Sequence, residues 1–273
     1  MDIHHMKTVL TIAGSDSSAG AGIQADLKTI TALGAYGATV ITAVTAQNTL
    51  GVRAVHPVPA DIVAEQMACV MEDLRPDAIK IGMLPNAEVV RAVADGLRQC
   101  QPPCTVVLDP VMVSTSGHRL MSEEAIALAY NELFPLCTLI TPNLGEAGLL
   151  LALGTVSTPA QMEQAALTLS RRLGTSVLVK GGHLAGDTLC DILCHGGQLT
   201  RYPAPRIATS NLHGTGCTLS SAIATHLALG LDLPSAVAGA ITYLRLAISA
   251  GRELHIGHGN GPLQHFFSSA HHS

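Results

Sequence analysis

Short aliphatic runs alternate with longer amphipathic stretches along most of the chain. The short runs predict β-strands, whereas stretches whose apolar positions recur every three or four residues predict helices. The expected strands are residues 7–13, 38–46, 52–57, 78–81, 105–109, 138–141 and 176–180. The expected helices are residues 23–33, 60–74, 88–98, 123–134, 145–151 and 160–173. This alternation is typical of a mostly parallel sheet with helices on both faces.

The pattern changes after residue 180. Residues 188–193 and 198–202, separated by His195-Gly196-Gly197, predict an antiparallel hairpin. Two long apolar helices are then expected, over residues 217–229 and 235–251. We find no linker or repeat, so we predict one three-layer α/β/α domain over residues 1–273, with a few antiparallel strands. Residues 1–6 and 267–273 are expected to be flexible tails.

The composition fits such a sheet and excludes other classes of protein. Of the 273 residues, 48% are hydrophobic, only 3% are aromatic and none is Trp, which predicts an aliphatic core. Charged residues make up 13%, and the formal net charge is −5. Because no basic stripe is available to neutralise phosphates, we expect no nucleic-acid partner.

Two features bear on the cellular compartment. The uncharged run over residues 33–52 is long enough to span a membrane, but its Gly and amide residues favour a turn and a buried strand, so we expect no membrane partner. The chain opens without the pattern of a secretory signal. Seven Cys residues, an odd number, do not suggest a disulfide framework, so we expect a cytoplasmic protein.

Polar and Gly-rich segments follow several of the expected strands, at the sheet edge where open α/β folds bind ligands. Among these loops are the ones after Ala13, Ala46, Ile81, Thr141 and Lys180. The strongest signal lies later, in His213-Gly214-Thr215-Gly216-Cys217, which leads into an apolar helix. Its glycines let the backbone approach a ligand, and the free N–H groups of the helix start can hold a phosphate.

This turn is specific only in its context. By itself, it is explained equally well as a Gly-containing helix start with a buried Cys. If it does bind an anion, Cys217 stands at the first expected helical position, and the positive end of the helix should lower its pKa.

Longer stretches of the sequence resemble a known family. Residues 213–224, HGTGCTLSSAIA, are similar to the anion-binding signature of ribokinase-like small-molecule kinases. Most of that superfamily has Asp where this chain has Cys217. The Cys version is typical of the hydroxymethylpyrimidine/phosphomethylpyrimidine kinases of thiamine biosynthesis, and of a related group of pyridoxal kinases. Residues 11–29, TIAGSDSSAGAGIQADLKT, and 257–262, GHGNGP, resemble further signatures of the pyrimidine kinases.

The resemblance implies a ribokinase-like fold and a role for each matching residue. The implied transfer residues are Gly214, Thr215, Gly216 and Cys217, with Cys217 as base on the substrate hydroxyl. The implied substrate-binding residues are Gly14, Ala21, Asp26, Gln47, Met83, Val111 and His213. Asp109, Asn143 and Lys180 would bind ATP, and Asn143 and Glu146 would hold Mg²⁺, through water. Singly, these residues have ordinary alternatives, such as core packing for Met83 and helix capping for Asn143 and Glu146.

The expected activity is therefore ATP-dependent phosphorylation of 4-amino-5-hydroxymethyl-2-methylpyrimidine and of its monophosphate. A pyridoxal kinase of the Cys-bearing type, acting in vitamin B6 salvage, is the main alternative. A binding protein that retains the fold without catalysis is a third possibility. The resemblance also implies a homodimer.

Overall fold

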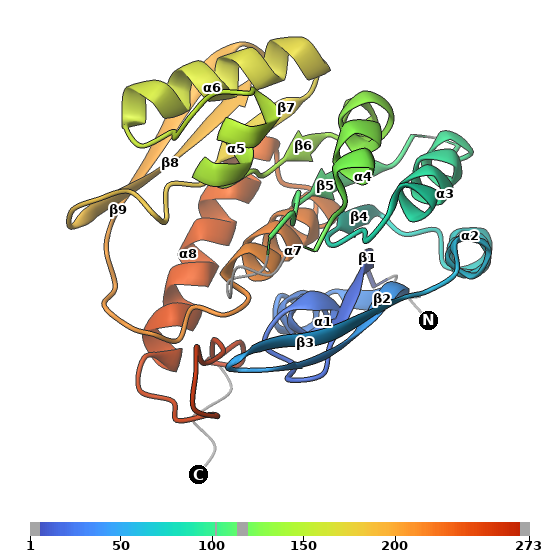
Figure 1. Ribbon diagram of the computed structural model, residues 1–273, viewed down its shortest axis with the longest axis horizontal. Helices are drawn as coiled ribbons and strands as arrows, with labels where there is room; N and C mark the ends of the chain where they lie inside the picture. The colour runs from blue at the N-terminus through green and yellow to red at the C-terminus, as the bar shows by residue number, and fades with distance from the viewer. Residues whose placement is uncertain (1–5, 102, 114–119, 268–273) are drawn as a thin grey trace, which may run out of the picture.

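A single mixed sheet organises the protein. The computed structural model describes residues 6–101, 103–113 and 120–267. Within these residues, nine strands form one sheet in the order β3-β2-β1-β4-β5-β6-β7-β8-β9 (Figure 1). They are β1 (Thr8–Asp16), β2 (Tyr36–Asn48), β3 (Gly51–Pro57), β4 (Ala78–Ile81), β5 (Thr105–Leu108), β6 (Leu139–Ile140), β7 (Ser176–Val179), β8 (Thr188–His195) and β9 (Gln198–Pro205).

The predicted mixture of parallel and antiparallel pairing is confirmed. β1, β2, β4, β5, β6 and β7 pair in parallel, whereas β3 joins one edge and β8 and β9 the other edge in antiparallel fashion. β1 continues beyond its expected end at Ala13 because β2 runs beside it as far as the pair Asp16–Thr45, after an irregularity between Ala13 and Ser15. Asp16 therefore ends a strand rather than lying in a free loop.

Helices cover both faces of the sheet, which gives the three layers expected from the sequence (Figure 1). They are α1 (Gly22–Ala32), α2 (Ala60–Asp73), α3 (Ala87–Arg98), α4 (Glu123–Leu128), α5 (Leu144–Leu150), α6 (Pro159–Leu173), α7 (Thr215–Ala228) and α8 (Leu233–Gly251). One apolar core lies between the sheet and α2 to α6, and a second between the sheet and α1, α7 and α8. Alternate strand residues supply the two cores: Val9 faces one, and Leu10 the other.

Some boundaries differ from the prediction. The helix expected over residues 123–134 divides into α4, a π-helical turn (Ala129–Leu133) and a 3₁₀ turn (Phe134–Leu136) that contains Pro135. α7 begins at Thr215, two residues earlier than predicted. The predicted tails lie largely outside the described residues, but Phe267 packs against Tyr243 with ring centroids 5.4 Å apart, so residue 267 belongs to the folded part.

The described residues also bear on membrane and metal binding. The uncharged run over residues 33–52 contains the turn that follows α1 and then the strand β2, as predicted. One helix, α8, is long and apolar enough to cross a membrane, but here it packs against α7 and contributes to the second core. All seven cysteines are free, and the described part of the chain contains no cluster of three or more His, Cys, Asp or Glu that would hold a metal ion.

A buried ion pair joins the layers beneath the strand ends. Lys80 of β4 and Asp26 of α1 are both fully buried, with Nζ 2.9 and 2.8 Å from the two carboxylate oxygens. The hydroxyls of Thr11 (β1) and Ser221 (α7) donate hydrogen bonds to the same carboxylate. Burial alone would lower the pKa of Lys80, but the charge and hydrogen bond of Asp26, together with the nearby Cys217 and Asp109, outweigh burial and raise it, so the lysine stays charged.

We expect Lys80→Met to reduce the free energy of unfolding by about 3 kcal/mol or more, because the change leaves the Asp26 charge buried without its partner. Urea titration followed by far-UV circular dichroism measures this, since the chain has no Trp. Lys7→Met, which removes the exposed pair between Lys7 and Asp77, is the control and should cost less than about 1 kcal/mol. Equal losses in the two variants would contradict the importance of the buried pair.

Candidate active site

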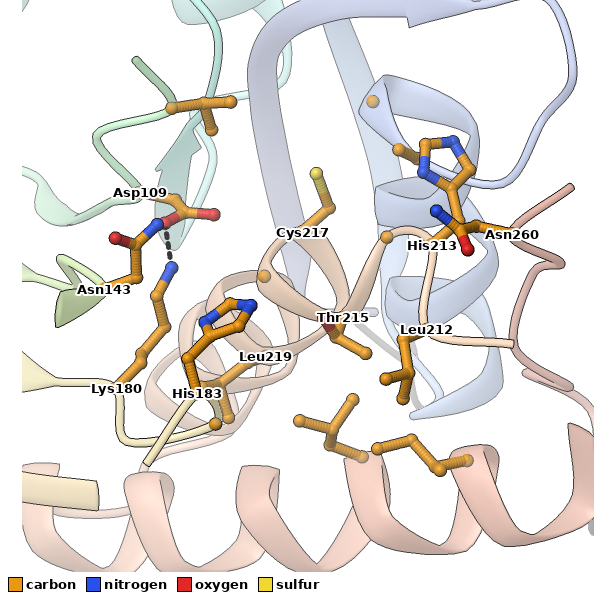
Figure 2. Close-up of a pocket in the computed structure, with 18 of the residues that line it drawn as sticks. Asp109, Asn143, Lys180, His183, Leu212, His213, Thr215, Cys217, Leu219 and Asn260 are labelled. Atoms are coloured by element: carbon orange, nitrogen blue, oxygen red, sulfur yellow. Dashed lines mark hydrogen bonds and ion pairs between the residues drawn. The ribbon is translucent and has the colours of Figure 1, made fainter. Parts of the chain in front are cut away.

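One elongated cavity of about 710 Å³ lies along the carboxyl ends of the parallel strands and the start of α7. Figure 2 shows Cys217 near its middle. Asp109, Asn143 and Lys180 gather on one side of Cys217, and His213 and Asn260 lie on the other (Figure 2). The cavity thus has a charged end and an end with imidazole and amide groups, with the first turn of α7 between them.

Glycines allow the loop that starts α7 to lie close to both ends of the cavity. Gly214 caps the helix with φ of +86°, and a side chain there would collide with the carbonyl oxygen of Gly20. A Cβ on Gly216 would lie 2.8 Å from Asp109 Oδ2 and 3.3 Å from Lys180 Nζ. The free N–H groups of the helix start therefore lie beside the Asp109–Lys180 ion pair, where an anion can be held.

The charged end consists of two carboxylates around one lysine. Lys180 Nζ forms an ion pair with Asp109 Oδ1, drawn as a dashed line in Figure 2. Asn143 and Glu146 form a capping box on α5: Glu146 N–H donates to Asn143 Oδ1 (2.9 Å), and Asn143 N–H donates to Glu146 Oε2 (2.8 Å). Burial raises the pKa of Glu146 to about 7; the charge of Lys180 opposes this increase, and that of Asp109 adds to it.

Cys217 is not the activated thiol that the sequence predicted. It is the third residue of α7, and the backbone N–H of Gly22 acts to lower its pKa. Burial nevertheless raises its pKa to about 11; the charge of Lys80 opposes the increase, and Asp26 and Asp109 add to it. The expectation of a lowered pKa is therefore wrong, because desolvation of the thiolate outweighs the helix start and the nearby lysine.

At the other end of the cavity, Gln47, His213 and Asp16 are in contact. His213 Nε2 lies 3.1 Å from the Gln47 amide and 2.8 Å from Asp16 Oδ2. Burial alone would raise the pKa of Asp16, but hydrogen bonds from His213, Ser18 and the N–H of Ala21 lower it to about 2. Gly14 and Met83 form another part of the cavity wall. They pack closely, because a Cβ on Gly14 would lie 3.1 Å from the sulfur of Met83.

Most of the residues singled out in the sequence line this one cavity. They are Gly14, Ala21, Gln47, Met83, Asp109, Val111, Asn143, Glu146, Lys180, His213, Gly214, Thr215, Gly216 and Cys217. Asp26 does not, because its carboxylate is fully buried in the ion pair with Lys80, and its prediction as a substrate-binding residue is corrected.

Several cavity residues were not predicted from the sequence, among them Asp16 and the residues of an apolar slot. Asp16 lies shortly after the first aliphatic run, and this position near a strand end could have identified it as a cavity residue. An apolar slot, formed by Leu212, Leu219, Ile241, Leu244 and Ile248, had no such signal because its residues come from a loop and two long helices. Figure 2 shows Leu212 and Leu219 beside α8.

Comparison with known proteins identifies the family. The phosphomethylpyrimidine kinase family model matches residues 16–264, a stretch that includes most of the cavity wall, whereas Ala13, Gly14 and Ser15 precede it. The chain belongs to this family. A hydroxymethylpyrimidine/phosphomethylpyrimidine kinase of Rhizobium meliloti is 52% identical over 94% of this chain and 96% of its own length. The enzyme of the same name from Escherichia coli K12 is 47% identical over 94% and 96% of the two chains.

Solved structures place the family among related vitamin kinases. The phosphomethylpyrimidine kinase of Clostridium difficile 630 shares 42% identity, with a TM-score of 0.78 over 89% of this chain and 99% of that chain. A Bacillus subtilis pyridoxal kinase, solved as an ADP complex, shares 34% identity, with a TM-score of 0.88 over 97% and 99% of the two chains. The predicted ribokinase-like fold is confirmed by these similarities.

Gly216→Ala is expected to reduce turnover about 10²-fold while the protein stays folded, because the added methyl group must displace the Asp109–Lys180 pair from the helix start. Steady-state kinetics with ATP measures the effect. Gly154→Ala, where a Cβ meets nothing within 4 Å, is the matched control and should keep full activity. Normal turnover in the Gly216 variant would show that the close approach is unimportant.

Alkylation of Cys217 by iodoacetamide should accelerate about tenfold per pH unit up to roughly pH 11, because only the thiolate reacts and the pKa is about 11. Peptide mass spectrometry follows Cys217 separately from the other cysteines. A free cysteine in a short peptide, with a pKa of about 8.5, is the reference and should level off first. A Cys217 rate that is already constant at pH 7 would indicate a thiolate and overturn this assignment.

Proposed function

We propose that this protein transfers the γ-phosphoryl group of ATP to 4-amino-5-hydroxymethyl-2-methylpyrimidine, and then to the resulting monophosphate, in thiamine biosynthesis. The observation that carries the proposal is the family match over residues 16–264, which covers most of the wall of a cavity suited to this reaction. The cavity combines a cationic end, a helix start and an amide-bearing end, and phosphoryl transfer depends mainly on positioning and charge stabilisation.

ATP would bind at the charged end. Among the residues that the structure describes, Lys180 has one ion-pair partner, Asp109, and an ammonium group has three donors, so Lys180 can also bind a nucleotide phosphate. The apolar slot between Leu219 and α8 is suited to the adenine ring. Structures of related pyridoxal kinases contain ADP, or AMP-PCP together with pyridoxal, which supports a nucleotide site in this fold.

The charged end also suits Mg²⁺. A buried carboxyl with a pKa raised to about 7 would gain from a cation next to it, and carboxylate oxygens are the ligands that Mg²⁺ prefers. Glu146 and Asp109 would hold the ion, with the remaining positions left to water and nucleotide phosphates. Asn143 uses its side-chain oxygen to cap α5, so we propose that it acts through water. Bound Mg²⁺ would neutralise the charge on the phosphate oxygens.

The start of α7 would hold the group in transfer. The N–H groups from Gly214 to Cys217 would bind the oxygens of the γ-phosphoryl group, while Cys217 would position the substrate hydroxyl. A thiol with a pKa of about 11 is neutral at physiological pH, which favours this positioning role over the role of thiolate base. Gln47 would bind the ring, because a carboxamide matches the adjacent amine and ring nitrogen of an aminopyrimidine.

The proposal is tested by ATP consumption in the presence of Mg²⁺, with hydroxymethylpyrimidine, its monophosphate and pyridoxal offered in parallel. We expect turnover on the pyrimidine and further turnover on its monophosphate. Preference for pyridoxal without a second phosphorylation would instead indicate the main alternative, a pyridoxal kinase. No ATP consumption with any of the three compounds would support a non-catalytic binding protein.

Two variants separate transfer from ring binding. Cys217→Ala should reduce turnover about 10²-fold with little change in pyrimidine affinity, because it removes a contact to the reacting hydroxyl. Gln47→Leu should mainly weaken pyrimidine binding, which calorimetry measures. Cys69→Ala, at an exposed cysteine, is the control for the first variant. Near-normal turnover in Cys217→Ala, or a loss of ATP affinity alone in Gln47→Leu, would contradict these roles.

The homodimer and the cytoplasmic location inferred from the sequence are kept as parts of the proposal. Sedimentation equilibrium of the purified protein tests the dimer.

A further inference from the structure

A carboxylate that has no role in the proposed mechanism lies beside Gln47. Asp16 is almost fully buried and ends β1. Its Oδ1 accepts hydrogen bonds from the N–H and hydroxyl of Ser18, at 2.8 and 2.7 Å, and its Oδ2 accepts one from the N–H of Ala21 at 2.9 Å. These donors keep the group ionised, with a pKa of about 2 despite its burial. Asp16 is therefore a hydrogen-bond acceptor only.

This carboxylate determines which atom of His213 carries a proton. Nε2 of His213 is 2.8 Å from Asp16 Oδ2, and two acceptors cannot share that distance, so Nε2 must be protonated whether the ring is neutral or charged. The same Nε2 lies 3.1 Å from the amide nitrogen of Gln47, whose amide oxygen lies on the Thr45 side. The one hydrogen of Nε2 points to Asp16 and leaves no lone pair for an amide N–H, so an amide NH₂ group is unfavourable there and the amide oxygen is favoured. The Gln47 amide oxygen therefore belongs on the His213 side.

The opposite end of the amide leads to the same orientation. The hydroxyl of Thr45 has one hydrogen, and the carbonyl oxygen of Ser15 at 2.9 Å takes it. The amide oxygen of Gln47 lies 3.3 Å from the Thr45 hydroxyl, whose hydrogen Ser15 already takes, so an NH₂ group in that position would instead find a lone pair. The main chain of Gln47 is held by Ser17, whose hydroxyl both donates to its C=O and accepts from its N–H. The orientation with oxygen toward His213 and nitrogen toward Thr45, obtained by exchanging the two amide atoms, therefore suits both neighbours.

We infer that Asp16 is a positioning residue that sets, through His213, which way round the aminopyrimidine ring binds to Gln47. The inference rests on the proposed function. A carboxamide edge offers one acceptor and one donor, and the 4-aminopyrimidine edge offers an amine and a ring nitrogen, so the two edges pair in one direction. With the amide oxygen on the His213 side, the amine also lies on that side.

The direction of the ring matters because the reacting group is next to the amine. The 5-hydroxymethyl group is on the carbon adjacent to the one that bears the amine, so it too lies on the His213 side. Gly214 follows His213 directly, and the helix start that would hold the phosphoryl group begins there. A reversed amide would reverse the ring and direct the hydroxymethyl group toward Thr45, away from that helix start.

The test is Asp16→Asn, assayed with two substrates: the 4-aminopyrimidine and its analogue without the amine, 5-hydroxymethyl-2-methylpyrimidine. An asparagine amide has a donor in place of one acceptor oxygen, so it no longer fixes the proton of His213 on Nε2 or, through it, the orientation of the Gln47 amide. We expect kcat/KM for the amino substrate to fall about tenfold or more, whereas that of the analogue, which has no amine to align, changes less than about threefold. The dissociation constant of the amino substrate should also change less than about threefold.

Two further variants make the result unambiguous. Asp232→Asn, at the N-cap of α8, changes a carboxylate that also accepts a backbone N–H, and should leave the ratio of the two kcat/KM values unchanged. If Asp16→Asn does not fold, as judged by its thermal unfolding, His213→Phe keeps a ring against Gly20 and removes the Nε2–H group. That variant should reduce the ratio by a similar factor.

Equal losses for both substrates in Asp16→Asn would indicate a merely structural role and overturn the inference. An unchanged ratio in both the Asp16 and the His213 variants would also overturn it, while leaving the proposed function intact. A wild-type protein that does not phosphorylate the aminopyrimidine would contradict the proposed function itself, and this inference with it.

Discussion

The arrangement of the active site depends on the buried ion pair between Lys80 and Asp26. Four elements that are distant in sequence meet at this carboxylate: β1 through Thr11, α1 through Asp26 itself, β4 through Lys80 and α7 through Ser221. Ser221 is one helical turn after Cys217, so the pair fixes the start of α7 relative to the ends of the strands. A buried charge pair tolerates little displacement, because either partner alone would be left desolvated.

A second lysine–aspartate pair lies at the same helix start but is built differently. Lys80 and Asp26 are fully buried, and two hydroxyls complete the carboxylate's hydrogen bonds. Lys180 and Asp109 line the cavity, next to Gly216. The first pair is therefore a fixed part of the scaffold, whereas the second can exchange partners with a charged ligand. The same two residue types serve structure in one place and binding in the other because of their different access to the cavity.

Much of this arrangement was predictable from the sequence, and the rest depends on contacts between distant segments. The aliphatic runs predicted β4 and β5 closely, and the loops after them brought Met83 and Asp109 to the cavity. The role of Asp26 was not predictable, because it depends on Lys80, which is 54 residues away. The pKa of Cys217 was missed for a similar reason: a local pattern shows the helix start but not the burial that raises the pKa.

A neutral Cys217 also suits the proposed pair of reactions. An aspartate at this position would add a carboxylate near Asp26 and Asp109, whose charges already raise the pKa of Cys217. The acceptor in the proposed second transfer is itself a phosphate monoester, with a charge between −1.5 and −2 at neutral pH. Another negative charge at the helix start would repel both this acceptor and the incoming phosphoryl group. A neutral thiol avoids that repulsion and can still donate a weak hydrogen bond, so it does not oppose the attraction of Lys180 and the N–H groups of α7 for the reacting phosphates.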